Sequence, residues 1–230
     1  MATANLLALD TATENCSVAL DYQGERLHIE EYAPRDHTKK VLPFVQQILS
    51  QAGIGLSQLD AIVFGRGPGS FTGVRIGVST AQGLAFGADL PMIGGSTLQA
   101  MSQAVARLHG AERCLAAIDA RMNEVYWGEY ALVDGLMTLQ GEEQVIPPEA
   151  LSASDVAACA VGTGWQTYAE LLQQRYPNAM LVENPLYPSA QDMLDYGQWA
   201  YAQGKHCPAC EAQPVYLRDK VTWKKLPGRE

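Results

Sequence analysis

Asp10 stands where an aspartate can meet a phosphate group or a metal-bound phosphate. It ends the apolar run of residues 5–9 and is followed by the hydroxyl residues Thr11 and Thr13. Hydroxyls and backbone amides in such a turn donate hydrogen bonds to phosphate oxygens. Aspartate and threonine are also common in turns that bind nothing. Taken alone, the segment therefore favours an ordinary turn.

Asp119 repeats this arrangement in the second half of the chain. The apolar run of residues 115–118 ends at Asp119, and the next alternating strand begins at the same distance as it does after Asp10. The repeat favours descent from a phosphate-binding loop, although descent does not establish present activity. Later, Gly162 and Gly164 precede a helix. Such a turn either flanks an adenosine or only starts the helix, and the second interpretation is at least as good.

The glycine-rich segment 65–77 leads into a predicted helix over residues 71–86. Backbone amides and the helix dipole at a helix start can bind an anion. The segment lacks the ending of a Walker A loop and the βαβ context of a dinucleotide fingerprint. The alternative is a tight connection that needs positive φ angles. Arg66 and Arg75 could serve an anion or pair with acidic residues of a partner, and the sequence leaves both open.

The sequence predicts no catalytic residue and no metal site. The four histidines are isolated, so neither His-x-x-x-His nor His-Glu-x-x-His occurs. There is no Gly-x-Ser-x-Gly motif, and no histidine is an obvious base for Ser70. Cys207 and Cys210 have the spacing of a redox pair or half a zinc site, but a second cysteine pair is missing. We interpret them as free thiols.

Composition limits the classes of function. The chain of 230 residues can form one large domain or two small lobes, and 47% apolar with 18% charged residues is typical of a globular protein. A net charge of −9 disfavours unaided RNA binding and suits docking on a basic partner. Since neither a membrane span nor a signal peptide is recognised, we expect a cytoplasmic protein with no membrane contact.

Hydrophobic periodicity predicts the elements that must position these residues. Residues 5–9, 16–22 and 25–32 form a meander of strands. Residues 38–52 form a helix with one apolar stripe. The helix 71–86 contains several glycines, each of which costs up to ~1 kcal/mol relative to alanine. We therefore expect it to pack closely against a neighbour.

The later elements restart the pattern. We expect strands over residues 60–65, 92–95, 115–118, 125–130 and 156–161, helices over 96–108, 165–175 and 189–203, and an extended segment over 213–223. The restart predicts an α/β protein with two lobes of related topology. We place the lobes at residues 1–108 and 109–230.

These residues resemble the TsaB family, also called YeaZ, along essentially the whole chain. The block 66–77 is the most specific part of the resemblance. The other segments that carry it are residues 9–13, 117–121, 124–127, 161–165, 214–218 and 223–228. The resemblance implies the actin/Hsp70-like fold, which is the duplicated, ribonuclease H-like ASKHA fold in two lobes. Cys207 and Cys210 are not part of the pattern.

The resemblance also implies a function. Family members are non-catalytic partners of TsaD, a paralogue that carries the metal-binding histidines and the catalytic centre. With the ATPase TsaE, the complex transfers a threonylcarbamoyl group to the adenosine beside the anticodon of tRNAs that read codons beginning with A. The chain itself would need no cofactor, ATP or ADP would bind only at the complex interface, and tRNA would be contacted only through the complex. The alternative is an actin-like ATPase or small-molecule kinase that uses Asp10 and Asp119.

The family pairs through its first two helices, both in self-dimers and with TsaD. The helices 38–52 and 71–86 correspond to them, and a glycine-lined face suits close helix packing. The alternative is that these faces pack only within the lobe. Our candidate interface residues are Val41, Leu42, Val45, Gly73, Val74, Gly77 and Ala81. Our candidate residues for a vestigial phosphate or nucleotide loop are Asp10, Thr11, Thr13, Asp119, Gly162 and Gly164.

Overall fold

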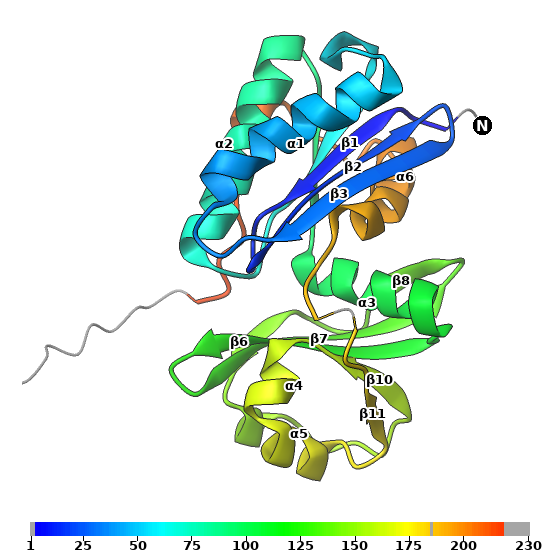
Figure 1. Ribbon diagram of the computed structural model, residues 1–230. Coiled ribbons are helices and arrows are strands. Elements are labelled where there is room, and N and C mark those ends of the chain that lie inside the picture. Colours follow the sequence, from blue (N-terminus) through cyan, green and yellow to red (C-terminus); the bar gives the residue numbers. More distant parts are fainter. Residues whose placement is uncertain (1–2, 185, 219–230) are drawn as a thin grey trace, which may run out of the picture.

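The computed structural model describes residues 3–184 and 186–218, which form two lobes, each built around one β-sheet (Figure 1). The first sheet has the strand order β3-β2-β1-β4-β5. Its strands are β1 (Leu6–Asp10), β2 (Asn15–Tyr22), β3 (Glu25–Tyr32), β4 (Ala61–Gly65) and β5 (Met92–Gly95). β1, β2 and β3 form an antiparallel meander, while β4 runs parallel to β1, and β5 runs parallel to β4.

Helices cover both faces of the first sheet. α1 (His37–Ala52) and α2 (Phe71–Ala88) lie on one face, and the 3-10 helix η3 (Ala190–Met193) with α6 (Leu194–Ala202) lies on the other. Side chains of a strand alternate between its faces. Accordingly, Leu7 and Leu9 pack under α1 and α2, whereas Leu6 and Ala8 pack under α6. This central strand is fully buried because both of its faces are covered.

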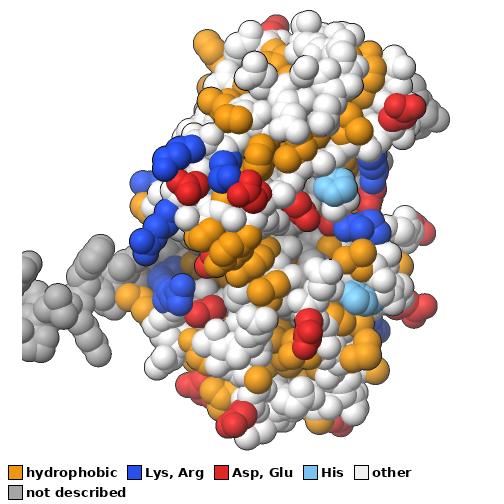
Figure 2. Space-filling model, viewed as in Figure 1, with side chains coloured by type: hydrophobic (Ala, Val, Ile, Leu, Met, Phe, Trp, Pro, Cys, Tyr) orange, Lys and Arg blue, Asp and Glu red, His pale blue; other side chains and the backbone are white. Residues whose placement is uncertain are grey.

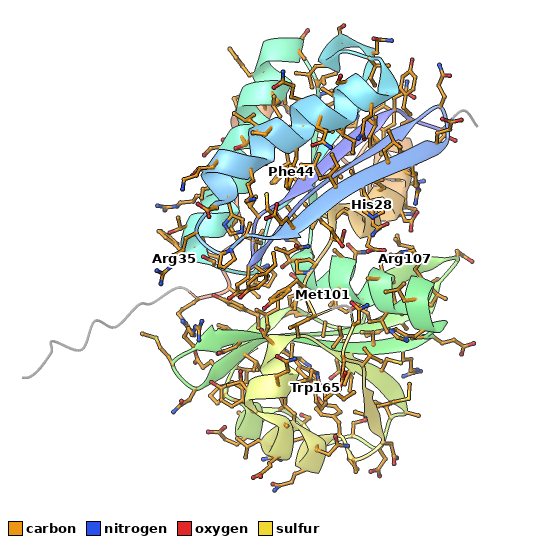
Figure 3. The ribbon with its side chains drawn as sticks, viewed as in Figure 1. His28, Arg35, Phe44, Met101, Arg107 and Trp165 are labelled. Atoms are coloured by element: carbon orange, nitrogen blue, oxygen red, sulfur yellow. The ribbon has the colours of Figure 1, made fainter. Side chains whose placement is uncertain are left out.

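The second sheet has the order β11-β10-β6-β7-β8, and β9 also pairs with β7. α3 (Thr97–His109) covers the face toward the first lobe, and α4 (Thr163–Thr167) with α5 (Ala169–Arg175) covers the other. Figure 3 shows Met101 and Arg107 on α3 between the sheets, and Trp165 beyond the second sheet. The strands are β6 (Arg113–Arg121), β7 (Glu124–Val133), β8 (Leu136–Leu139), β9 (Gln144–Ile146), β10 (Ala158–Val161) and β11 (Ala179–Leu181).

The two sheets share a central arrangement. β1 pairs with antiparallel β2 on one side and parallel β4 on the other, and β6 pairs in the same way with β7 and β10. Asp10 and Asp119 lie near the ends of the two equivalent strands. The predicted α/β fold in two lobes of related topology is therefore confirmed.

Packing does not follow the predicted division at residue 108 throughout. α3 packs against the second sheet through Leu98, Met101 and Val105, although it precedes that division. Conversely, η3 and α6 return to the first sheet, where Met193 and Leu194 are buried. The chain thus crosses between the lobes just before α3 and again between β11 and η3, and the domain limits themselves stay a prediction.

Local differences from the predicted elements have local causes. The predicted helix 165–175 is interrupted at Tyr168, whose backbone has φ −122° and ψ 33°, and becomes α4 and α5. The predicted helix 189–203 begins as the 3-10 helix η3. The predicted extended segment 213–223 is described only through residue 218, and the family segment 223–228 lies outside the described residues. No helix of the described segments 3–184 and 186–218 is long and apolar enough to cross a bilayer.

Candidate functional site

Asp10 is sealed inside the first lobe. Its side chain is completely buried, and its Oδ1 accepts a hydrogen bond of 3.1 Å from the Ala12 N–H. Its Oδ2 has no hydrogen-bond partner among the residues that the structure describes. Burial raises the pKa of Asp10 to about 7, because the charged form loses its water and the Ala12 N–H offsets only part of that loss. A Cβ at Gly65 would overlap Oδ2, so glycine at the end of β4 makes room for this carboxyl group.

The turn after Asp10 packs directly on the start of α2. Thr11 Oγ1 donates a hydrogen bond of 2.7 Å to the Gly73 carbonyl. A Cβ at Gly73 would overlap the Thr11 carbonyl oxygen, and one at Gly77 would lie 2.8 Å from Thr11 Oγ1. A Cβ at Gly69 would overlap the Ala12 carbonyl oxygen. The expected close packing of the glycine-rich helix is confirmed, and its neighbour is this turn.

Asp119 occupies a different environment. Its N–H donates to Thr163 Oγ1 at 3.0 Å, and its Oδ1 accepts from the Arg121 N–H at 2.8 Å. Its Oδ2 lies 3.3 Å from Arg121 Nη1. Gly162 adopts φ +106°, and a Cβ there would overlap the Ala117 carbonyl oxygen. The glycine turn therefore serves to start α4 directly against β6.

A cleft of about 580 Å³ lies between the lobes. The first lobe contributes residues 12–14 and 69–71, and the second contributes residues 118–122, 163, 166 and 167 together with Tyr126. Among the six residues predicted for a phosphate or nucleotide loop, Thr13 and Asp119 line this cleft. The structure does not bring the other four to the cleft. Asp10 and Thr11 are buried inside the first lobe, and Gly162 and Gly164 are packed against β6.

The cleft also contains residues that the sequence did not predict for this site, although three of them lie in segments that carry the family resemblance. Thr163 and Thr167 contribute hydroxyl groups, and Arg121 and Arg218 contribute guanidinium groups. Arg121 pairs with Asp119, while Arg218 contacts Glu124 Oε2. In the described part of the chain, no three His, Cys, Asp or Glu side chains are grouped so that they could hold a metal ion. The cleft thus offers threonine hydroxyls, while each of these two arginines is paired with a carboxylate of the same chain.

Arg66 and Arg75, for which the sequence allowed either an anion or acidic residues of a partner, both contact side chains of this chain. Arg66 Nη2 lies 3.4 Å from Glu143 Oε2. The Arg75 guanidinium lies 3.7 Å from the centre of the Phe71 ring, and its Nε donates to Tyr216 Oη at 2.8 Å. Arg66 is therefore paired with a carboxylate, whereas Arg75 is held by two aromatic side chains and keeps an exposed positive charge. Figure 2 shows acidic and basic side chains side by side along the band where the two lobes meet.

Most of the predicted pairing residues lie inside the first lobe, and the pairing itself stays a prediction. Leu42 is 50% exposed, but the other six point into the first lobe, as the alternative interpretation had it. The apolar stripe of α1 faces the sheet, because burial of that stripe is what holds the helix in place. The small residues of α2 face the turn at residues 10–12. The buried six are Val41, Val45, Gly73, Val74, Gly77 and Ala81.

The outward faces of the same two helices form a shallow groove of about 500 Å³. Val41 reaches its floor, while Leu42 and Phe71 are largely exposed in it. Its remaining lining residues are Thr38, Thr72, Arg75, Ile76, Ser79 and Thr80. A surface of α1 and α2 is therefore open in this chain, although most of its residues are not the predicted ones.

Two lobes of related topology with a cleft between them define a protein of the actin-like class. A family model described as "TsaD: tRNA N6-adenosine threonylcarbamoyltransferase" matches residues 29–224. The chain is 50% identical over 236 residues to the tRNA threonylcarbamoyladenosine biosynthesis protein TsaB of Haemophilus influenzae, covering 98% of each chain. It is 48% identical over 235 residues to TsaB of Escherichia coli, covering 98% of this chain and 99% of that one.

A solved structure of YeaZ from Pseudomonas aeruginosa matches with a TM-score of 0.87 and 49% identity, over 93% of this chain and 100% of that chain. The chain therefore belongs to the TsaB (YeaZ) family, as its sequence predicts.

Proposed function

We propose that this chain is the non-catalytic subunit of the complex that transfers a threonylcarbamoyl group to the adenosine adjacent to the anticodon of tRNAs reading ANN codons. Its relatives are named for this biosynthesis. The observation that carries the proposal is the position of Asp10, which in an enzyme of this fold would meet metal-bound phosphates. Here its carboxyl group is buried behind Gly65 and does not line the cleft. Because the substrate is tRNA, we place the protein in the cytoplasm.

The proposed partner is TsaD, bound through the outward faces of α1 and α2. Leu42 and Phe71, which is 57% exposed, offer apolar contacts at the centre of this groove. Arg75 adds a cation that is held in place by Phe71 and Tyr216. The net charge of −9 fits a chain that leaves tRNA contacts to its partners. The chain alone would form a homodimer through the same surface, and TsaE would join the heterodimer.

The test is association with TsaD from the same organism, measured by gel filtration with light scattering. We expect a one-to-one complex, and we expect Leu42→Arg to weaken it at least about tenfold, as replacement of a central apolar contact does. Leu108→Arg is the matched control, because Leu108 is also an exposed helical leucine, 47% accessible, but lies on α3. Gly77→Arg would be a poor probe, since a side chain there meets Thr11 and disturbs the fold.

No complex at micromolar concentration, or equal losses in Leu42→Arg and Leu108→Arg, would contradict the proposed surface. The cleft between the lobes supports a second candidate, an ATPase or small-molecule kinase. That candidate predicts Mg-ATP turnover by the isolated chain and its loss in Asp119→Ala, because Asp119 is the predicted acid that reaches the cleft. Such turnover would replace the non-catalytic proposal.

A further inference from the structure

Four polar side chains meet where the chain first crosses from one lobe to the other, and we name them the Glu143 cluster: Arg66, Ser96, Tyr130 and Glu143. The Glu143 side chain is only 6% exposed. Tyr130 Oη donates to its Oε1 at 2.6 Å, and Ser96 Oγ donates to the same oxygen. Arg66 Nη2 lies 3.4 Å from its Oε2. A buried carboxylate thus contacts three donors.

The donors come from both lobes. Arg66 follows β4 and Ser96 follows β5, so both lie at the carboxyl ends of parallel strands of the first sheet. Tyr130 lies in β7, and Glu143 lies between β8 and β9 of the second sheet. The Glu143 carboxylate therefore receives two of its three contacts from across the lobe boundary.

The backbone around the cluster is also cross-linked. The Arg66 N–H donates to the Gly95 carbonyl at 2.9 Å. The Thr97 N–H donates to the Gly67 carbonyl at 3.2 Å, and Thr97 Oγ1 donates to the Pro68 carbonyl. Since Ser96 caps α3, the helix that covers the second sheet starts from this cross-linked segment.

Burying a carboxylate is costly unless its oxygens are hydrogen-bonded. Two-lobed proteins open and close by rotation about the few residues at which the chain crosses between lobes. Such a rotation would pull Arg66 and Ser96 away from Glu143 and leave the carboxylate with Tyr130 alone. The rotation would therefore leave a buried charge short of partners.

We infer that the Glu143 cluster holds the two lobes at one angle and opposes opening or closing of the cleft between them. Glu143 is a positioning residue in this inference. At the other end of α3, Arg107 pairs with the buried Asp192 through two contacts of 2.7 and 3.0 Å (Figure 3). α3 is thus fixed at both of its ends. The inference depends only on the contacts between the lobes, so it stands or falls independently of the partner TsaD.

The test compares Glu143→Ala with Glu142→Ala, which makes the same change at the exposed neighbouring position. Amide hydrogen exchange is followed by NMR at Arg66 and Thr97, whose bonds to the Gly95 and Gly67 carbonyls lie on either side of Ser96, where the chain leaves the first lobe. We expect roughly tenfold faster exchange at these two amides in Glu143→Ala, as loss of a hydrogen bond to a charged group allows. Amides of β1 and β6, and all amides of Glu142→Ala, should exchange at the original rates.

Arg66→Met and Tyr130→Phe separate a tie between lobes from local packing. Arg66→Met keeps the aliphatic stem but removes the contact across the boundary, so it should act like Glu143→Ala. Tyr130→Phe removes the donor that lies in the same lobe as Glu143 and should have the smaller effect. If Glu143→Ala fails to fold, Glu143→Gln and Arg66→Met still carry the test.

The inference is overturned by unchanged exchange at Arg66 and Thr97 in both Glu143 and Arg66 variants. It is equally overturned if exchange rises by the same factor in β1 and β6, since that shows general loss of stability. A larger effect of Tyr130→Phe than of Arg66→Met would make the cluster a feature of the second lobe alone.

Discussion

Asp10 retains a carboxyl group in a place that water does not reach. Its Oδ2 is unpartnered among the described residues, and the pKa of the group is raised to about 7 by burial. At neutral pH the fold therefore bears the cost of a half-ionised buried acid. Thr11 beside it donates its hydroxyl hydrogen to the Gly73 carbonyl, so this turn serves packing.

The raised pKa of Asp10 predicts a distinctive pH dependence. Between the ordinary value of 3.8 and about 7, the folded state holds a proton that the unfolded state releases. The free energy of unfolding therefore falls as pH rises through this window, by an amount on the order of a few kcal/mol. Asp10→Asn removes this titration, so its stability relative to the parent should grow from pH 4 to 7 and level off above.

Urea unfolding at several pH values measures this difference. Asp119→Asn is the control, because it makes the same change at an aspartate that lines the cleft beside Arg121 and is not sealed inside a lobe. Parallel pH profiles for Asp10→Asn and the parent would mean that Asp10 is ionised inside the fold at little cost.

α2 shows how one helix can contain glycines for different reasons. Gly73 and Gly77 are required by the turn at residues 10–12, whereas Gly83 meets no described atom within 4 Å of where a Cβ would lie. The segment 66–77 is thus specific to the family because its glycines allow the backbone of α2 to approach the backbone of the turn at residues 10–12. Gly83 and Gly87, at which a Cβ would meet no described atom within 4 Å, only weaken the helix.

This difference predicts opposite effects of the same substitution. Gly73→Ala should lower the free energy of unfolding by about 1–3 kcal/mol, because the new methyl group overlaps the Thr11 carbonyl oxygen. Gly83→Ala should raise it by about 0.5–1 kcal/mol through helix propensity alone. Thermal and urea unfolding of both variants measure the effects. If both variants were destabilised to a similar extent, the close approach to Thr11 would not be the reason for a glycine at position 73.

The elements with local patterns could be predicted from the sequence. α1 was placed within one residue of its observed start, and the strand meander was confirmed, because side-chain period and turn residues are local. The break at Tyr168 and the return of α6 to the first sheet depend on packing between distant segments. Such packing leaves no periodic signal in one sequence.

The candidate surfaces show the same limit. Thr13 and Asp119 could be predicted because Thr13 follows β1 and Asp119 lies near the end of β6, whereas Arg218 reaches the cleft from a segment about one hundred residues away from Asp119. Six of the seven predicted pairing residues are buried in the first lobe, because an apolar stripe marks the face that a helix buries in its own lobe. Leu42 and Phe71 lie off that stripe, so only the structure shows them exposed.

At the scale of the whole molecule, side-chain and backbone contacts join the two lobes in addition to the two chain crossings. Besides the two crossings, the segment before residue 218 ties to both lobes: the Val215 N–H donates to the Arg66 carbonyl, and Arg218 contacts Glu124. Arg107 and Asp192 join α3 to η3. We therefore expect the described chain to unfold as one cooperative unit, with neither sheet unfolding alone.

This cooperativity is a testable prediction. Trp127 and Trp165 are buried in the second lobe, so with Trp199 and Trp223 replaced by Phe, fluorescence reports that lobe, whereas far-UV circular dichroism reports helices of both. The two signals should give coincident urea transitions. In the double variant Arg107→Met with Glu143→Ala, both charged ties at the ends of α3 are lost, and the transitions should separate. Separate transitions already in the parent would show that the lobes unfold independently, whereas coincident transitions in the double variant would show that the apolar contacts of α3 suffice to couple them.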